Sequence, residues 1–304
     1  MTPIDQVQLN FNESSLLLLN VLIGLIMFGV ALDIRVDDFR RVVRDPRGPL
    51  IGLGAQFLLL PAFTFLLIGI VDPAPSLALG MILVAACPGG NFSNFLAAYA
   101  RSNAALSVSM TAVSTALAIV MTPLNLSFWG NLNPETAAIL TRVSLDPLDL
   151  LVTIVLILGV PLAAGMALVQ WRPERAARMR RPMRIFSLVA FGLFIIGALA
   201  ANWQEFLTYV GAVAALVALQ NAVALAVGYW TSRGLGSPLY DARAISIEVG
   251  IQNSALALVL IFTFFDGLGG MAIIAAWWGV WHLISGLTVA TWWARQPVPV
   301  PEMV

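Results

Sequence analysis

Glu248 is the residue of this chain whose type and position most strongly suggest chemistry. It is the only acidic residue deep inside a long apolar segment, in the string Ile-Ser-Ile-Glu-Val-Gly-Ile-Gln-Asn-Ser at 245–254. A carboxylate near the middle of a bilayer costs at least about 3 kcal/mol on insertion scales, so it is retained where cations or hydrogen-bond donors meet it, or where it is protonated. We therefore rank a binding role for Glu248 above a structural one.

A second polar interruption, Cys-Pro-Gly-Gly-Asn-Phe-Ser-Asn, lies at 87–94 in an earlier apolar segment. Pro88, Gly89 and Gly90 disfavour a helix, and unwound backbone at membrane depth is tolerated only inside protein or beside a wet cavity. Its carbonyls can bind a cation, and the N-terminus of a half-helix can bind an anion. Oxygen ligands suit Na⁺, whereas a soft metal would need Cys or His. The oxygen-bearing side chains near the two breaks, besides Glu248, are Ser93, Asn94, Ser107, Thr111, Gln252, Asn253 and, from an earlier segment, Gln56.

Each of the neutral residues also has a structural interpretation. Ser107 and Thr111 are four positions apart and could bond to their own helix or pack against a neighbour. Gln56 could join two helices, and Pro-Gly-Gly could be a simple kink. Cys87 is the only cysteine, which excludes an internal disulfide and a Cys/His metal cluster, and we expect it to be a buried structural thiol.

The elements that must position these residues are membrane helices. Of the residues 60% are hydrophobic and 11% charged, with a mean hydropathy of +0.89, which is far from a soluble domain. We predict an all-α integral membrane protein of nine helices, the third and eighth broken. The predicted spans are 14–32, 47–70, 75–101, 104–128, 149–170, 183–201, 205–231, 238–266 and 270–294.

The arginines predict the orientation, because the chain has no lysine. With the N-terminus outside, fifteen of the sixteen arginines fall in cytoplasmic segments and only Arg142 falls outside, a strong positive-inside bias. The first residues have no signal-peptide pattern, so the first helix is expected to direct insertion. We predict a multi-pass protein of the cell inner (plasma) membrane with a cytoplasmic C-terminus. The predicted interface anchors are Trp129, Trp171, Trp203, Trp230, Trp292 and Trp293.

The two breaks also predict an internal repeat. Five spans separate them, and an odd number of spans per repeat inverts the second copy, as in inverted-repeat transporters. We divide the chain into 1–145, with about four helices, and 146–304, with about five. The longest connections are expected at 129–149 and at the basic stretch 171–184.

Several motifs resemble the bile acid:sodium symporter family, as a bacterial homologue. They are Met-Phe-Gly-Val-Ala-Leu at 27–32, Asp-Asp-Phe at 37–39, Gln56 with Pro61, Cys-Pro-Gly-Gly at 87–90, Ser93-Asn94, the Ala-Leu-Ser-Val-Ser-Met-Thr-Ala-Val-Ser-Thr string at 105–115, and Ile-Glu-Val-Gly-Ile-Gln-Asn-Ser at 247–254. The resemblance runs from about residue 26 to the last helix. It implies a core domain with two crossing broken helices, which we assign to helices near 47–128 and 183–266, and a panel domain of the remaining helices.

The resemblance also implies two sodium ions and their ligands. The first site would use Ser93, Asn94, Ser107, Thr111 and the Glu248 carboxylate. The second would use Gln56, Glu248, Gln252 and the backbone carbonyls of Val249 and Ile251. In this family the position of Asn91 varies with the substrate. Because we expect no arginine within the spans, a carboxylate substrate would rely on half-helix N-termini and on Asn91, Asn253 or His282, the only histidine. His282 also has a structural interpretation, as a satisfied packing residue.

The predicted function is sodium-coupled symport of an organic anion, bile-acid-like or a small carboxylate, by alternating access, and not catalysis. The expected partners are the lipid bilayer and the anion; we infer no nucleic acid and no obligate protein partner. A proton-coupled or uncoupled carrier of the same fold, with Glu248 titrating, is the main alternative. A membrane prenyltransferase is more remote, because Asp33 and Asp37 form one Asp-x-x-x-Asp pair without a second acidic motif.

Overall fold

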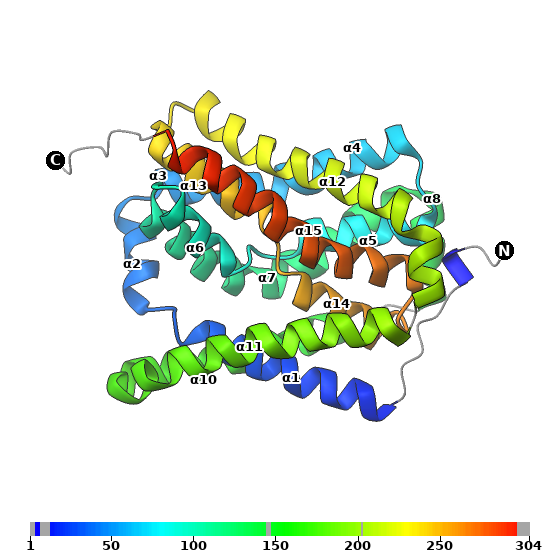
Figure 1. The fold of residues 1–304 in the computed structure, drawn as a ribbon, viewed down its shortest axis with the longest axis horizontal. Helices are drawn as coiled ribbons and strands as arrows, with labels where there is room; N and C mark the ends of the chain where they lie inside the picture. Colours follow the sequence, from blue (N-terminus) through cyan, green and yellow to red (C-terminus); the bar gives the residue numbers. More distant parts are fainter. Residues whose placement is uncertain (1–3, 7–12, 144–146, 202, 297–304) are drawn as a thin grey trace.

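The computed structural model describes residues 4–6, 13–143, 147–201 and 203–296. These residues are helical apart from turns and short connections, and the only β feature among them is one antiparallel bridge between Gly89 and Gln252. Most helices run along the long axis of the molecule (Figure 1). The prediction of an all-α fold is therefore confirmed.

Ten helices precede residue 144 in the described chain. They are η1 (Ile4–Gln6), α1 (Glu13–Ala31), α2 (Val36–Arg44), α3 (Arg47–Gly54), η2 (Ala55–Leu59), α4 (Leu60–Val71), α5 (Pro75–Ala86), α6 (Phe92–Tyr99), α7 (Ala104–Leu132) and α8 (Pro134–Arg142). Those that follow are α9 (Pro147–Ile154), η3 (Val155–Gly159), α10 (Val160–Trp171), α11 (Pro173–Ala201), α12 (Trp203–Gly234), α13 (Leu239–Gly250), α14 (Ser254–Phe264) and α15 (Gly269–Ala294). The division predicted at residue 145 lies outside the described residues.

Five helical rods in the described chain are long and apolar enough to cross a membrane. They are Arg47–Val71, Ala104–Leu132, Leu151–Trp171, Val213–Gly234 and Gly269–Ala294. The first joins α3, η2 and α4, and the third includes η3 and α10. The shorter apolar helices α5 and α14 each belong to one of the predicted broken segments, where the chain leaves the helix at 87–91 and 251–253. The chain thus leaves the helix within both stretches where a break was predicted.

The two predicted long loops are largely helical, so that prediction was wrong. In the basic stretch only Arg172 separates α10 from α11, which begins at Pro173 and runs on without a break. Proline at the first helical position is pre-organised for a helix, and arginine is a good helix former. In the other stretch, the Asn133 side chain accepts a hydrogen bond from the Glu135 N–H at 2.9 Å and starts α8.

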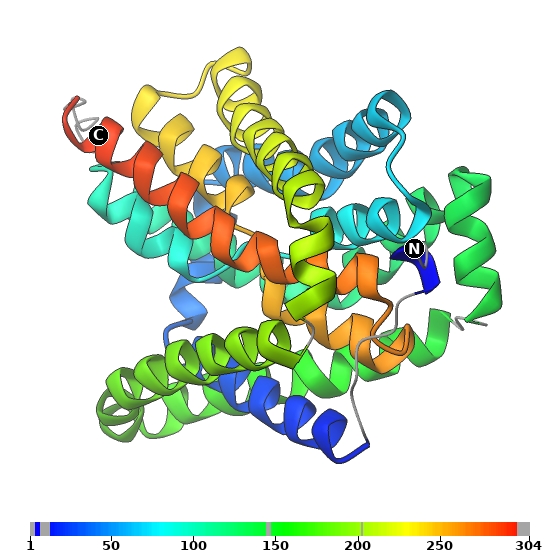
Figure 2. The ribbon, with the colours of Figure 1, turned by 45° about the vertical axis from the view of Figure 1, so that its right-hand side comes forward.

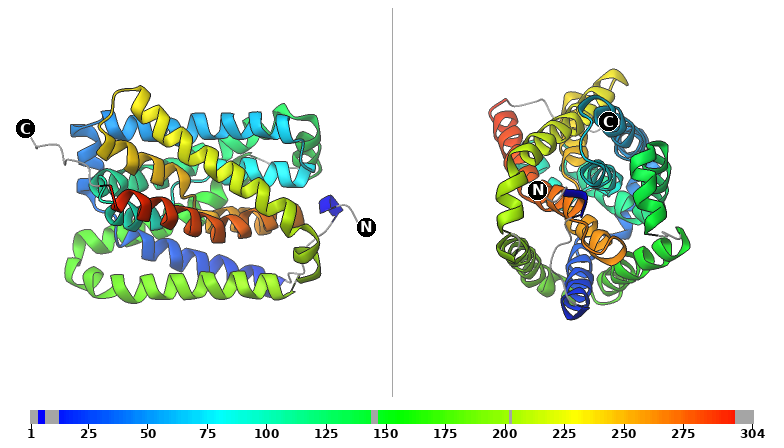
Figure 3. Two further views of the ribbon diagram at one scale, coloured as in Figure 1. Left: turned by 45° about the horizontal axis from the view of Figure 1, so that its top comes forward. Right: turned by 90° about the vertical axis from the view of Figure 1, so that its right-hand side faces the viewer.

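The helices form two packed groups. Helices α1, α10 and α11 pack on one another and lie along one side of the bundle in Figures 2 and 3. The larger group contains α3–α7 and α12–α15, with α13 against α12 and α15 against α5. Small residues allow close approach within each group: a Cβ at Gly165 would collide with Ala31, and one at Gly80 would lie 2.8 Å from the Met271 Cα.

A buried arginine lies well inside the predicted span 238–266, where no arginine was expected. Arg243 belongs to α13, is 3% exposed, and donates to the backbone carbonyls of Trp293 at 3.2 Å and Gln296 at 2.7 Å. Its guanidinium lies 5.6 Å from the centre of the Trp293 ring. Trp293 is thus buried against a guanidinium group and is not an exposed interface anchor. Trp171 and Trp230 are exposed, as expected for interface anchors.

Candidate functional site

The two breaks cross, and their backbones pair reciprocally. The Gly90 N–H donates to the Ile251 carbonyl at 2.6 Å, and the Asn253 N–H donates to the Pro88 carbonyl at 2.9 Å. A side chain would be crowded at this close approach, because a Cβ at Gly90 would lie 3.1 Å from the Gln252 carbonyl oxygen. Proline and glycine therefore end α5 where the second broken helix must pass.

The Glu248 carboxylate lies beside this crossing and is 1% exposed. Its Oε2 accepts hydrogen bonds from Ser93 Oγ at 2.5 Å and Ser107 Oγ at 2.7 Å, and its Oε1 accepts one from Thr111 Oγ1 at 2.6 Å. Within the described chain no arginine or histidine forms an ion pair with it. The charge is therefore met by three hydroxyl groups, all from the first half of the chain.

Asn94 makes this cluster deficient in protons. Its Oδ1 lies 2.9 Å from Ser107 Oγ and 3.1 Å from Thr111 Oγ1, the two hydroxyl groups that also contact Glu248. Each hydroxyl has one proton, so it cannot donate to the carboxylate and to the amide oxygen at full strength together. Such converging oxygen atoms without enough protons are suited to a cation. The chemistry of this donor set therefore fits Na⁺.

A second oxygen-rich group lies around Gln56, which is 1% exposed. Its Nε2 donates to the Cys87 carbonyl at 2.9 Å and to Gln252 Oε1 at 2.7 Å, and Gln252 Nε2 donates to the Val249 carbonyl at 2.7 Å. Gln56 Oε1 is buried and has no hydrogen-bond partner in the described part of the protein. An orphaned buried acceptor beside these carbonyls also fits a cation.

Gln56 reaches the crossing from a π-helical turn, η2. The turn is followed by Pro61, which lacks an N–H group and whose ring clashes with the carbonyl four residues earlier. The helix accommodates this by widening locally, and π-turns are frequent at functional sites. The same pattern, η3 followed by Pro161, recurs in the α9–α10 rod.

The three predicted substrate residues lie around the crossing but are not joined to one another by any hydrogen bond among the described residues. Asn91 immediately precedes α6, and Asn253 Oδ1 caps α14 by accepting from the Leu256 N–H at 3.1 Å. His282 is buried in α15 and its Nδ1 has no partner in the described chain. One helical turn beyond it, Gly286 packs against Ile251.

Two polar side chains of α12 were missed in the sequence. Gln220 Nε2 donates to the Met81 carbonyl at 2.8 Å, and Asn221 Nδ2 donates to the Gly250 carbonyl at 2.8 Å. Both are almost fully buried. An adjacent pair of amides within the apolar range 205–231 was the signal that could have revealed them.

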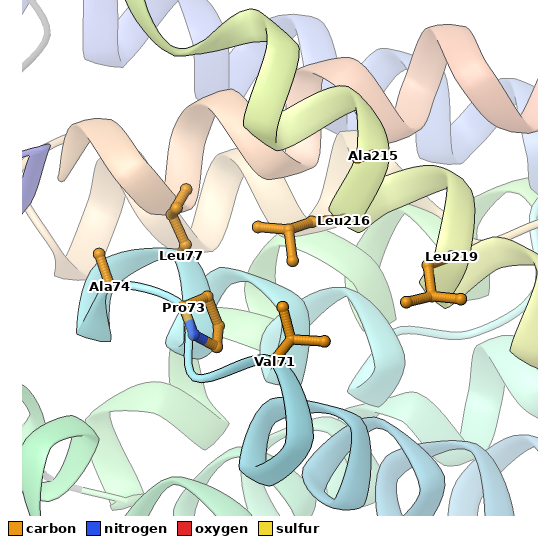
Figure 4. Close-up of a pocket in the computed structure, with 7 residues that line it drawn as sticks. All are labelled: Val71, Pro73, Ala74, Leu77, Ala215, Leu216 and Leu219. Atoms are coloured by element: carbon orange, nitrogen blue, oxygen red, sulfur yellow. The ribbon is translucent and has the colours of Figure 1, made fainter.

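A cavity of about 390 Å³ lies elsewhere, between the α4–α5 connection and α12 (Figure 4). Its lining side chains are apolar, and none of them belongs to the two breaks or contacts Glu248. It is lined by Val71, Pro73, Ala74, Leu77, Ala215, Leu216 and Leu219.

Comparison with known proteins gives consistent matches over most of the chain. The family described as Sodium Bile acid symporter family matches residues 20–208. A Bacillus subtilis protein named as an uncharacterized sodium-dependent transporter is 31% identical over 91% of this chain and 83% of its own length. The probable chloroplastic sodium/metabolite cotransporter BASS1 of Arabidopsis thaliana is 32% identical over 89% of this chain, which spans 65% of that protein. The human ileal sodium/bile acid cotransporter is 27% identical over 80% of this chain and 68% of its own length.

Proposed function

Because the chain belongs to the sodium bile acid symporter family, whose members are transporters and not enzymes, we propose that it is a sodium-coupled symporter of an organic anion. The names of its relatives, a sodium-dependent transporter and sodium/metabolite or sodium/bile acid cotransporters, support the coupling ion and the substrate class. The observation that carries the proposal is the proton-deficient oxygen cluster around Glu248.

Two sodium ions would share the Glu248 carboxylate. The first would be held by Ser93, Asn94, Ser107 and Thr111, where Ser107 and Thr111 each face two acceptors with one proton. The second would be held near Gln56 Oε1, which has no hydrogen-bond partner among the described residues, with Gln252 and the carbonyls of Val249 and Ile251. A shared carboxylate explains why one acidic residue is retained where its burial is most unfavourable.

Alternating access would come from the two packed groups of helices. We propose that α1, α9–α10 and α11 form the panel and that the larger group forms the core, which rocks against it. The division expected from the sequence placed 183–201 in the core and 270–294 in the panel. The proposed division exchanges these two helices. Nine spans in two inverted repeats, with the N-terminus outside, complete the proposal. The reciprocal backbone pairing of 88–90 with 251–253 supports the repeat, because a two-fold relation predicts such symmetry.

The sodium gradient is sufficient to concentrate an anion. At about 100 mV, inside negative, each cation gains about 2.3 kcal/mol, and a tenfold gradient adds about 1.4 kcal/mol. Two ions supply about 7.4 kcal/mol, and bringing in one monovalent anion uses about 2.3 of it. The remaining amount, about 5 kcal/mol, corresponds to a few thousand-fold accumulation.

The proposal is tested by uptake into proteoliposomes from a panel of organic anions that includes a bile acid and small carboxylates. Uptake should disappear when Na⁺ is replaced by choline or K⁺ at constant pH. Undiminished uptake in sodium-free medium with a proton gradient would instead favour the proton-coupled carrier. Asn91, Asn253 and His282 are proposed to contact the anion, so Ala variants there should change the preference within the panel.

A further inference from the structure

The amide of Asn221 joins three helices at the depth of the crossing. Its Nδ2 donates to the Gly250 carbonyl at 2.8 Å, and its Oδ1 accepts from Ser285 Oγ of α15 at 2.6 Å. The Asn221 side chain is 1% exposed. Both ends of the amide are therefore used, and its orientation on α12 is fixed.

The Gly250 carbonyl needs this donor because α13 ends there. In a continuing helix it would accept from the N–H of Ser254, but that N–H donates to the Gln252 carbonyl at 3.0 Å. The neighbouring carbonyls are held from other sides: Val249 by the Gln252 side chain at 2.7 Å, and Ile251 by the Gly90 N–H at 2.6 Å. Three consecutive carbonyls are thus each fixed by a different element.

The middle carbonyl sets the direction of the other two. Successive carbonyls alternate in direction along extended backbone, and Ile251 is extended, with φ −108° and ψ 96°. A rotation of the Gly250 peptide would also turn the peptides on either side of it. Because α13 continues to Gly250, the carbonyls of Val249 and Gly250 leave the helix end together, whereas the extended Ile251 turns its own carbonyl away, toward the Gly90 N–H. Holding the Gly250 carbonyl toward α12 therefore also fixes the directions of the carbonyls of Val249 and Ile251.

We infer that Asn221, anchored by Ser285, is a positioning residue that sets the sodium affinity of the second site without being a ligand. The inference rests on the proposed function, since it requires sodium at the carbonyls of Val249 and Ile251. Removal of the amide frees the Gly250 carbonyl, and the unwound segment then loses the preorganisation on which ion affinity depends.

Gln220 provides a matched control from the adjacent position. Its side chain is also a buried amide of α12, and it also donates to a backbone carbonyl, at 2.8 Å. That carbonyl belongs to Met81, inside the regular helix α5, and not to the unwound segment. Gln220→Ala should therefore remove comparable packing and hydrogen bonding while leaving the proposed ion ligands in place.

The experiment is thermal unfolding of the purified protein, titrated with NaCl against choline chloride at constant ionic strength. Asn221→Ala should raise the sodium concentration for half-maximal stabilisation at least tenfold. Ser285→Ala should raise it at least threefold, because this variant keeps the Asn221 N–H donor but loses the hydroxyl that holds the Asn221 amide in place. Gln220→Ala should change this sodium concentration less than twofold, although the variant should have a lower melting temperature in choline.

An unchanged half-saturation in Asn221→Ala, or an equal shift in Gln220→Ala, would overturn the inference. If Asn221→Ala does not fold, Ser285→Ala decides alone by the same criterion. The wild-type titration separates the two proposals. A wild-type protein that sodium does not stabilise refutes the proposed function and the inference with it, whereas wild-type stabilisation with unaffected variants refutes only the role of Asn221.

Discussion

Replacing Glu248 by glutamine tests whether its charge binds the ions. Glutamine has nearly the same shape, and the three hydroxyl groups around residue 248 can rotate to donate to its oxygen or accept from its NH₂ group. Hydrogen bonding and packing are therefore largely retained. What Glu248→Gln removes is one unit of negative charge from each proposed ion site.

The burial of Glu248 determines the size of the effect. Two unit charges 4 Å apart attract by about 1 kcal/mol in bulk water and about 4 kcal/mol at an effective dielectric constant of about 20. The second value applies because the side chain is 1% exposed. Since 1.4 kcal/mol is a factor of ten, Glu248→Gln should weaken sodium binding several hundred-fold, against roughly fivefold for a solvated carboxylate.

The assay is the same sodium titration of thermal unfolding, combined with uptake. Sodium at 100 times its dissociation constant should stabilise the wild-type protein by about 2.7 kcal/mol per site, and the variant should show no stabilisation and no uptake. In choline the variant should unfold at a temperature no lower than that of the wild-type protein, because a buried charge that has hydrogen bonds but no counterion among the described residues has been removed. A sodium half-saturation within about fivefold of the wild-type value would refute the reasoning, because it would match a solvated charge.

Three further substitutions test separate features. A Cβ at Gly89 would collide with the Glu248 carboxylate, so Gly89→Ala should abolish uptake and reduce sodium stabilisation; normal uptake would show that the crossing is looser than described. Arg243→Ala removes the charged hydrogen bonds from the buried guanidinium to the carbonyls of Trp293 and Gln296, and should lower the free energy of unfolding by about 1.5–3 kcal/mol with the sodium titration unchanged. Asp33→Asn removes partly exposed ion pairs with α11, so stability should fall by less than about 1 kcal/mol and uptake should persist; an Mg²⁺-dependent prenyl transfer that this substitution abolishes would contradict the transporter assignment.

The positions of the helices and their breaks could be predicted because they depend on local sequence. An apolar run long enough to cross a bilayer forms a helix, since every backbone group must be satisfied internally. Pro88 and the two glycines after it end α5 for reasons contained within a few residues. The basic start of α11 was predicted to be a loop because a run of charges indicates a solvated segment. A solvated segment can nevertheless be helical.

The partners in the site could not be obtained from spacing alone. The hydroxyl groups that contact Glu248 lie 155, 141 and 137 residues earlier in the chain, and only the family resemblance indicated that they meet it. Asn221 was missed for a related reason. An amide in an apolar span has many available partners, and the contact of Asn221 with Gly250 depends on how α12 packs against α13. The π-turn at Gln56 was not predicted either, because it depends on how the packed helix accommodates Pro61.

The one-sided origin of the hydroxyl groups around Glu248 has a consequence for how the protein is made. Synthesis proceeds from the N-terminus, so Ser93, Ser107 and Thr111 are already in the membrane when Glu248 leaves the ribosome. Until then these hydroxyl groups can bond to carbonyls of their own helices. Glu248 has no such alternative. A second half inserted alone would bring the Glu248 carboxylate into lipid without its hydrogen-bond donors. The hydrogen-bond donors of Glu248 are therefore synthesised before the carboxylate that needs them.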